Sequence, residues 1–483
     1  MSLRLSNATV ACVPATVIRP AYDRARTDGG VLHFGPGAFH RVHQAWYAQR
    51  LLAHDPRWGI DAVSLHGRAV RDALAPQDGL YTLAVQDREP ALEVIGAVRT
   101  VLVAPERPGA VIERFADPAL RLVTLTVTEK GYCLDASGHL DLAHPDIVAD
   151  LAHPDAPASV LGYLVAGLRL RRRLALPPPA VVSCDNVADN GRKLGEAVVA
   201  LAREIDPGLA TWIEGEARFP RTMVDSICPA TTDALRDDVR QRLGAVDAWP
   251  VQREAFVQWV VEDLPGLGLE PWADVGATFT PDVAAFERAK LRVLNGAHST
   301  LAYLGLRAGC VTVAEAMRHD ELVGFVRTML YEDVLPTLGT IDGLDLPGYV
   351  ETVLRRFTNP AIVHQLAQIA WDGSQKLQFR ILGTVRDALA AARPIDRLCI
   401  PLAAWLWFVR RKVDARSPIV DPLVERLVQL GQAWSGQVQA DVARFLTLRE
   451  VFGEDLPAEP LFRAALERGY ARVREWPGRP LSA

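Results

Sequence analysis

The sequence predicts an α/β protein with two domains: a doubly wound parallel sheet in the N-terminal part and a mainly α-helical C-terminal part. Short β-rich runs alternate with helical patterns in the first half, which is typical of parallel strands connected by helices. From about Pro281 onward the pattern changes to long amphipathic helices. The chain has 483 residues, more than one hydrophobic core usually supports. We therefore expect domains at 1–280 and 281–483.

Four apolar runs are the predicted strands of the sheet. Each is short, rich in β-branched or other apolar residues, and bounded by polar or turn-forming residues. The Pro-rich stretch 176–179 stiffens the loop before the last of them, because a proline run cannot continue a helix. The strands are expected at 31–34, 62–65, 122–127 and 180–183.

The composition excludes several classes of partner. The formal net charge is -5, so the chain lacks the excess of basic residues that binding to a phosphate backbone requires. Nucleic acid is therefore not expected as a partner. The six cysteines lie far apart, with no histidine at zinc-ligand spacing, which predicts reduced thiols in a cytoplasmic protein and no metal site. The N-terminus lacks a signal-peptide pattern, and the run CIPLAAWLWFV is too short to cross a bilayer, so no membrane association is expected. No pattern predicts an oligomeric state.

The loop after the first predicted strand carries a signal for a nucleotide. Gly35-Pro36-Gly37 stands between a strand and a helix, where backbone N–H groups can approach a pyrophosphate. His40 replaces the third glycine of the dinucleotide fingerprint, so an ordinary strand-to-helix turn is an equal alternative. No acidic residue follows the second strand to hold ribose hydroxyls. Arg68 stands there and could meet a 2′-phosphate, which leaves NADP open beside NAD.

A polar cluster shares one face of the helix predicted over 284–304. Lys290, Asn295 and His298 fall within an arc of about 140°, together with three leucines. Polar groups on a partly apolar face have to be hydrogen-bonded or functional. The alternative is a satisfied core histidine beside a lysine whose stem is buried and whose amine reaches water.

Three further segments place polar side chains where regular packing does not require them. Cys184-Asp185-Asn186 ends a predicted strand, at the sheet edge where α/β proteins bind ligands. Met223-Val224-Asp225-Ser226 is expected to be a loop, and its aspartate could be a simple turn residue. Asn359-Pro360 is predicted to open a helix that runs through Ala370 and ends at Asp372-Gly373. Gly373 and Lys376 could then be only a C-cap and a cation at the helix end.

Taken together, these motifs resemble the mannitol dehydrogenase family, the polyol-specific long-chain dehydrogenases and reductases. The matching segments span nearly the whole chain in order, and the spacing K-x4-N-x2-H is the most specific element. The resemblance implies an N-terminal Rossmann-type domain, a mainly helical C-terminal domain and metal-independent oxidoreductase activity with NAD or NADP. The segments are HFGPGAFHRVHQAWY, LTVTEKGY, SCDN with a following NG, MVD, KLRVLNGAH, NPAI and DGSQK.

The resemblance also implies roles for individual residues. Lys290 is similar to the family's general base, and His298 to the histidine that helps position the substrate oxygen. Asn186 and Asn295 resemble the pair that hydrogen-bonds this oxygen as alkoxide character develops. Substrate hydroxyl contacts are implied for Asp225 and Lys376, and we expect the cofactor at Phe34, Gly35, Gly37, Ala38, Phe39, Arg68, Thr128 and Glu129.

Two positions favour a sugar acid over a neutral polyol as the small-molecule substrate. Mannitol-type members tend to have glycine where this chain has Lys130 and arginine where it has Gln368. In both respects the chain resembles the fructuronate reductases, also called mannonate oxidoreductases. Lys130, Lys376 or Arg380 could pair with a substrate carboxylate.

The function that this resemblance implies is the interconversion of D-mannonate and D-fructuronate. Oxidation of a neutral polyol such as mannitol or arabinitol is the alternative within the same class. A non-catalytic nucleotide-sensing protein is the alternative of another class, and it leaves the cluster on the helix 284–304 unused.

Overall fold

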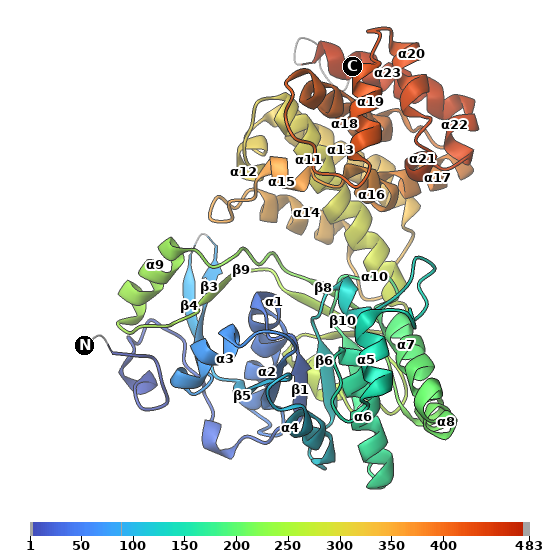
Figure 1. Cartoon of the computed structure of the whole chain (residues 1–483). Coiled ribbons are helices and arrows are strands. Elements are labelled where there is room, and N and C mark those ends of the chain that lie inside the picture. Colours follow the sequence, from blue (N-terminus) through green and yellow to red (C-terminus); the bar gives the residue numbers. More distant parts are fainter. Residues whose placement is uncertain (1–2, 88, 477–483) are drawn as a thin grey trace. The chain divides into compact units, whose positions relative to one another are not determined.

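The computed structural model describes residues 3–87 and 89–476, and the chain divides into two compact units (Figure 1). The N-terminal unit is Met1–Val283 and the C-terminal unit is Ala284–Ala483. The first is built from sheets and helices, whereas the described part of the second contains helices and no β-strand. The fold class predicted from the sequence is therefore confirmed.

A five-stranded parallel sheet forms the centre of the N-terminal unit. Its strand order is β5-β2-β1-β6-β7, so the chain builds outward from β1 in both directions, as in a doubly wound sheet. Val31 pairs with Ile60 on one side and with Leu122 on the other. All four predicted strands are present, and β5 was not predicted. The strands are β1 (Val31–Phe34), β2 (Ile60–Ser64), β5 (Val98–Val103), β6 (Leu122–Leu125) and β7 (Ala180–Ser183).

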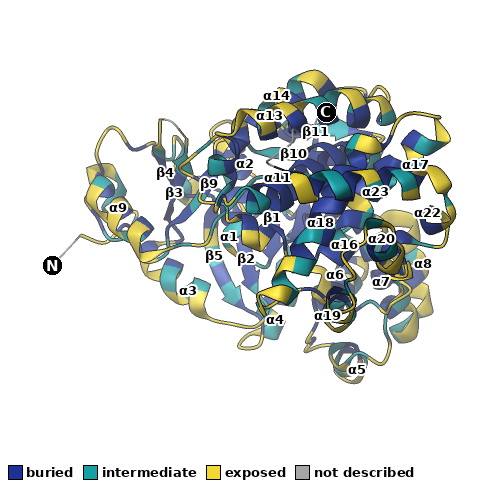
Figure 2. Ribbon diagram, turned by 90° about the horizontal axis from the view of Figure 1, so that it is seen from above, coloured by how far each residue is buried: buried dark blue, intermediate teal, exposed yellow. Residues whose placement is uncertain are grey.

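The hydrophobic core lies on both faces of this sheet. Successive strand residues point to opposite faces, so Val31 and Val182 belong to one apolar cluster while Leu32 and Val181 belong to another. Every residue of β1, β6 and β7 is buried, whereas the edge strand β5 also carries intermediate and exposed residues, which Figure 2 colours teal and yellow. The helices of the unit are α1 (Ala38–Val42), α2 (Gln44–Leu52), α3 (Ala69–Leu74), α4 (Pro108–Glu113), α5 (Pro145–Ala152), α6 (Val160–Arg173), α7 (Asn190–Ile205), α8 (Pro207–Glu216) and α9 (Asp233–Leu243).

Two three-stranded sheets complete the N-terminal unit and correct one prediction. The segment Met223-Val224-Asp225-Ser226 is not a loop, because its first three residues lie in a buried strand that pairs antiparallel with β10. This pairing joins residues more than thirty positions apart, which local sequence patterns do not reveal. The strands are β8 (Thr222–Asp225), β10 (Gln258–Glu262) and β11 (Thr278–Thr280) in one sheet, and β4 (Ala91–Ile95), β3 (Tyr81–Gln86) and β9 (Val251–Glu254) in the other.

Helix α18 forms the core of the C-terminal unit. The apolar run of the sequence lies in this helix, and its residues are largely buried against α11 and α23. No helix among the described residues is long and apolar enough to span a membrane. The helices are α10 (Val283–Ala289), α11 (Gly296–Arg307), α12 (Val313–Ala316), α13 (Asp320–Thr328), α14 (Leu346–Phe357), α15 (Leu366–Ile369), α16 (Gly373–Leu377), α17 (Gly383–Ala390), α18 (Asp396–Asp414), α19 (Val424–Gln432), α20 (Val438–Phe445), α21 (Arg449–Phe452), α22 (Asp455–Ala458) and α23 (Pro460–Glu475).

Three π-helical segments interrupt the helices of this unit: η7 (Lys290–Asn295), η8 (Met329–Val334) and η10 (Gln378–Leu382). The helix predicted over 284–304 is therefore not a regular α-helix. It consists of α10, the wide turn η7 and α11 in succession. A π turn contains one extra residue relative to an α turn, so the positions before and after η7 do not keep α-helical spacing.

The helix predicted from Asn359 through Ala370 is wrong for most of its length. The Asn359 side chain accepts the N–H of Ala361 at 3.0 Å and forms a local turn. The following backbone pairs with residues 311–313, and Val313 donates to the His364 carbonyl at 3.0 Å. Only α15 remains helical in this segment. Asp372 also begins a helix instead of ending one, because α16 starts directly after it.

Candidate active site

The topological switch point of the main sheet lies between β1 and β6. The strands β2 and β5 follow on one side of β1, and β6 and β7 follow on the other. In doubly wound proteins, ligands bind beyond the carboxyl ends of the strands at this point. Two loops occupy this position, residues 35–39 after β1 and residues 126–132 after β6. Apart from Arg68, every residue predicted to contact the cofactor belongs to β1, to these loops or to the helix turn that follows each of them.

Gly35 allows the first loop to approach the second. Its φ of 89° lies in the left-handed region, and a Cβ atom here would stand 2.2 Å from the carbonyl oxygen of Thr126. The Thr126 hydroxyl donates to the Gly35 carbonyl at 2.7 Å. A Cβ atom at Gly37 would meet nothing closer than 3.9 Å. The backbone at Gly37 is therefore open to the close approach that a pyrophosphate requires.

Two buried histidines support the first loop from inside. The Nε2 atom of His33 lies 3.1 Å from the Gly35 carbonyl oxygen, and its Nδ1 atom lies 2.8 Å from the Thr124 hydroxyl. His40 stands at the position of the missing glycine and stacks on His33 with ring centroids 3.3 Å apart. Burial lowers the pKa of His33 to about 3 and that of His40 well below its usual value. Both rings are neutral at physiological pH, so His40 serves as a core residue.

His40 predicts a specific pH dependence of stability. The unfolded chain protonates this residue as the pH falls through about 6.5, whereas the folded protein keeps it neutral. Below that pH, the wild type is expected to lose about 1.4 kcal/mol of unfolding free energy per pH unit relative to a His40→Gln variant, which cannot be protonated. Urea unfolding of both proteins between about pH 7 and pH 5 measures the difference. Parallel pH profiles would contradict this assignment.

The second loop is held by Asp185, which follows β7 and is 9% exposed. The carboxylate accepts the backbone N–H groups of Val127 at 3.2 Å and Thr128 at 2.8 Å, and the Tyr132 hydroxyl at 3.0 Å. Thr128 has φ 68° and ψ 166°, a backbone region occupied almost only by glycine. Burial raises the pKa of Asp185, while the three donors act in the opposite direction.

A buried asparagine ties the ends of β7 and β8 together. The Asn190 amide donates to the carbonyl oxygens of Asp185 at 3.0 Å and Thr222 at 3.1 Å, and it accepts the Thr222 N–H at 2.9 Å. Of the predicted residues on these strands, Asp225 is buried at the end of β8 and Asn186 is exposed just after β7. Glu129 and Lys130 are exposed on the short 3-10 helix η5 (Glu129–Tyr132).

In the C-terminal unit, the wide turn η7 carries two of the three predicted catalytic residues. Lys290 is its first residue and is 9% exposed, and Asn295 is its last and is half-buried. His298 follows in α11 and is 7% exposed. A Cβ atom at Gly296, the first residue of α11, would stand 3.0 Å from the Arg380 carbonyl oxygen, so the start of α11 packs closely on η10. Such π turns are rare and are frequent at functional sites.

His298 lies among aromatic and cationic groups. Its ring centroid is 4.3 Å from that of Phe357 and 5.0 Å from that of His364. Burial lowers the pKa of His298 well below its usual value, and His364 and Arg380 lower it further. The imidazole is therefore neutral, with one nitrogen able to donate a hydrogen bond and the other able to accept one.

Lys376 and Arg380 bring positive charge to the same cluster. The Lys376 ammonium lies 3.6 Å from the Asp372 carboxylate, and the Arg380 guanidinium donates to the Ser299 hydroxyl at 3.1 Å. Burial lowers the pKa of Lys376, and it lowers the pKa of Arg380 to about 10. A largely desolvated guanidinium beside a neutral hydroxyl can bind an anionic group strongly.

The segment that carries Lys376 is held by Asp421. This carboxylate accepts the Ser374 N–H at 2.9 Å and the Ser374 hydroxyl at 2.5 Å. A Cβ atom at Gly373 would stand 2.5 Å from the Tyr303 hydroxyl, so packing requires glycine at this position. The predicted C-cap role of Gly373 is wrong, because the residue lies in the first turn of α16.

Within each unit, most of the predicted residues come together. The N-terminal set follows β1, β6, β7 and β8, and the C-terminal set surrounds η7, α11 and η10. Two predicted residues stand apart on exposed positions, Arg68 at the start of α3 and Gln368 in α15. Sequence reasoning gave no role to three buried groups that position the others, Asp185, Asn190 and Asp421. Asp185 and Asn190 lie in the SCDN and NG segments that carry the family resemblance, whereas no sequence signal pointed to Asp421.

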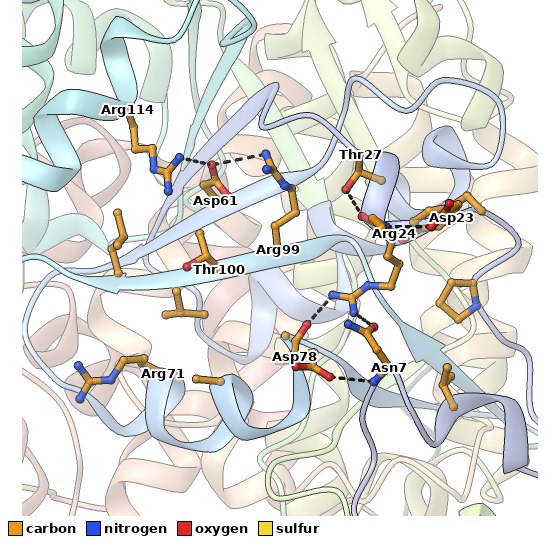
Figure 3. A pocket seen from close by; sticks show the side chains of 18 of the residues that line it. Asn7, Asp23, Arg24, Thr27, Asp61, Arg71, Asp78, Arg99, Thr100 and Arg114 are labelled. Atoms are coloured by element: carbon orange, nitrogen blue, oxygen red, sulfur yellow. Dashed lines mark hydrogen bonds and ion pairs between the residues drawn. The ribbon is translucent and has the colours of Figure 1, made fainter.

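A cavity of about 1210 Å³ in the N-terminal unit lies along β5, the edge strand of the main sheet (Figure 3). Asp61 in its wall lies 3.3 Å from the Arg114 guanidinium and 3.7 Å from that of Arg99. Arg24 donates to the backbone carbonyls of Gly96 and Val98 at its opposite side. Protein acceptors already engage these cations, and none of the predicted residues is among the described residues that line the cavity. We assign neither cofactor nor substrate to it.

One group of side chains has the residue types that can ligate a metal ion. Its possible ligand atoms lie within 4.8 Å of one another and belong to Cys133, His144 and Asp146. The His144 Nδ1 atom already accepts the Asp146 N–H at the start of α5. Burial raises the pKa of the Cys133 thiol to about 12. A protonated thiol and an engaged nitrogen do not favour a metal ion, and we assign none to this cluster.

A doubly wound sheet with a glycine turn at its switch point, followed in the chain by a helical unit, is an arrangement typical of the dehydrogenase class. Two family models match the chain, the mannitol dehydrogenase Rossmann domain over residues 29–272 and the mannitol dehydrogenase C-terminal domain over residues 282–474. The chain belongs to the mannitol dehydrogenase family and is an oxidoreductase.

Relatives with different substrate names resemble the chain over nearly its full length. D-mannonate oxidoreductase of Escherichia coli is 40% identical over 470 residues, which are 95% of this chain and 96% of the relative. A substrate-free D-sorbitol dehydrogenase structure superimposes with a TM-score of 0.91 at 33% identity, covering 98% of both chains. Mannitol 2-dehydrogenase of Pseudomonas fluorescens, in a ternary complex with NAD and D-mannitol, has a TM-score of 0.80 at 36% identity and covers 98% of this chain and 97% of its own. Family membership therefore does not select between a sugar acid and a polyol.

Proposed function

We propose that the protein interconverts the secondary alcohol and the ketone of a sugar acid, D-mannonate and D-fructuronate, with NAD as the hydride carrier. The observation that carries this proposal is the cationic surrounding of His298. Arg380 and Lys376 are partly desolvated there, and Arg380 contacts a neutral hydroxyl. A substrate carboxylate would pair with such a group, whereas a neutral polyol offers no charge to it.

The loops of the N-terminal unit fit a dinucleotide. Gly37 leaves its backbone open, and the strained Thr128 backbone stands on the neighbouring loop at the same edge of the sheet. A dinucleotide bound there would supply the hydride acceptor for the alcohol as NAD and the hydride donor for the ketone as NADH. The NAD complex of the Pseudomonas fluorescens relative supports NAD. NADP remains an alternative, because Arg68 is exposed after β2, where a 2′-phosphate would be read.

The assigned roles follow from residue chemistry. Lys290, which is buried, takes the proton of the substrate hydroxyl as general base. Asn186 and Asn295 donate hydrogen bonds to the oxygen as negative charge develops on it. The neutral His298 ring orients the same oxygen. Asp225, Lys130 and Lys376 are assigned to the remaining hydroxyl and carboxylate groups of the substrate.

The sugar-acid proposal predicts a substrate preference that depends on one arginine. The wild type is expected to turn over mannonate with a higher kcat/KM than mannitol or arabinitol. An Arg380→Gln variant should raise the KM for mannonate about 10–100-fold, because a charge-assisted hydrogen bond is lost, and should change polyol turnover much less. Arg386→Gln is the matched control, since this arginine pairs with Asp455 at the surface. The assay follows NADH absorbance with each substrate and each cofactor.

Two outcomes of that screen would select another function. A clear preference for a neutral polyol would replace the sugar-acid assignment by a mannitol or arabinitol dehydrogenase. Retained binding of NAD without hydride transfer to any polyol or aldonate would favour a nucleotide sensor.

A further inference from the structure

The loop after β6 holds a backbone conformation that its own sequence does not favour. Thr128 is β-branched, yet its φ of 68° and ψ of 166° fall in a region that is essentially restricted to glycine. Such strain persists only where surrounding contacts determine the conformation, and it is concentrated at functional sites. A set of contacts that holds Thr128 in place is therefore required.

Asp185 supplies these contacts from the neighbouring strand end. One carboxylate oxygen accepts the Thr128 N–H at 2.8 Å, and the other accepts the Val127 N–H at 3.2 Å and the Tyr132 hydroxyl at 3.0 Å. The Tyr132 hydroxyl also bonds to Ser183 on β7. Both ends of the segment 127–132 are thus bound to β7 through one buried carboxylate.

We propose that Asp185 is a positioning residue that locks the segment 127–132, and that this lock sets the affinity for cofactor and substrate. The inference rests on the proposed function, in which Thr128 and Glu129 contact the cofactor and Lys130 contacts the substrate. The lock needs a carboxylate, because both oxygens accept hydrogen bonds. The amide of an Asp185→Asn variant would turn an NH2 group toward an N–H or O–H donor.

The chain offers a chemically matched control in Asp441, at α20 of the C-terminal unit. Its buried carboxylate accepts the Ser435 N–H and the Ser435 hydroxyl, each at 2.7 Å, and the Gly436 N–H at 2.9 Å. It therefore also holds two backbone donors and one hydroxyl, and the Arg444 guanidinium lies 3.4 Å from it as an additional partner. None of these partners is a predicted site residue. Asp441→Asn should lower stability by a similar mechanism without changing the segment 127–132.

The experiment compares Asp185→Asn, Tyr132→Phe and Asp441→Asn with the full-length wild type. Asp185→Asn is expected to weaken NADH binding, measured by fluorescence titration, at least about tenfold, and to raise KM more than it lowers kcat. Tyr132→Phe removes one of the three hydrogen bonds and should show a smaller change in the same direction. It also tests the lock if Asp185→Asn does not fold. Asp441→Asn should lower Tm and leave the NADH affinity unchanged.

Limited trypsin digestion reports on the lock without any assumption about the reaction. Lys130 is exposed, so release of the segment should accelerate cleavage after this residue in Asp185→Asn and not in Asp441→Asn. Mass spectrometry of the fragments identifies the cut. Unchanged NADH affinity and unchanged cleavage after Lys130 in both Asp185→Asn and Tyr132→Phe would overturn the proposal. If the wild type turned over no sugar acid while the lock variants still lost NADH affinity, the proposed substrate would fail and the lock would stand.

Discussion

Replacing Lys290 by alanine is expected to lower kcat about 10²–10⁴-fold while leaving the NADH affinity close to that of the wild type. The side chain is buried at the start of η7, two helical turns from the neutral His298, and its assigned role is to accept the hydroxyl proton. Stopped-flow or steady-state NADH absorbance measures kcat, and fluorescence titration measures NADH binding.

Lys412→Ala is the control for the loss of a lysine, because this residue stands near the end of α18 with its ammonium 5.7 Å from the Phe408 ring centre. It should keep wild-type kcat. Since Lys290 is buried, thermal unfolding of both variants separates loss of catalysis from loss of fold. Near-normal turnover of Lys290→Ala would remove this residue from the mechanism.

Gly35→Ala is expected to destabilise the N-terminal unit by about 2–6 kcal/mol, because backbone strain and overpacking add at this position. The new Cβ atom would stand 2.2 Å from the Thr126 carbonyl oxygen, in a backbone conformation with φ of 89°. The two nearest atoms are the carbonyl oxygen and carbonyl carbon of Thr126, which belong to the backbone and cannot move aside as the end of a side chain could. Urea unfolding of the full chain gives the free-energy change.

Gly37→Ala tests the same loop where space is available. Its Cβ atom would meet nothing closer than 3.9 Å, and its φ of -70° suits alanine. The free energy of unfolding should therefore change little, whereas NADH affinity should fall because the methyl group occupies the open backbone surface. Equal destabilisation by Gly35→Ala and Gly37→Ala would contradict the described contact between the two loops.

Elements with a strong local signal were predicted correctly. The strands β1, β2, β6 and β7 are apolar runs bounded by turn signals, and each has its partners within one parallel sheet. Elements that depend on distant partners were missed. The strand β8 exists because it pairs with β10, and residues 364 and 365 are not helical because the backbone of 311–313 pairs with this segment.

The same distinction applies to the candidate site. Gly35, Lys290 and His298 could be proposed as site residues from the sequence, because their residue types and their spacing match known motifs. Asp185, Asn190 and Asp421 could not, since an aspartate or asparagine between regular elements or at the start of a helix can be a surface turn or capping residue. Only burial and the donors that surround each side chain distinguish them.

The sequence by itself determined the doubly wound sheet, the helical second half, the glycine turn and the Lys-Asn-His spacing. Each of these rests on interactions among residues close in the chain or on an apolar pattern repeated within one element. The tertiary structure decided the π turn at Lys290, the strained backbone at Thr128 and the neutral state of His40 and His298. Those properties arise from desolvation and from contacts between distant segments, which exist only once the chain has folded.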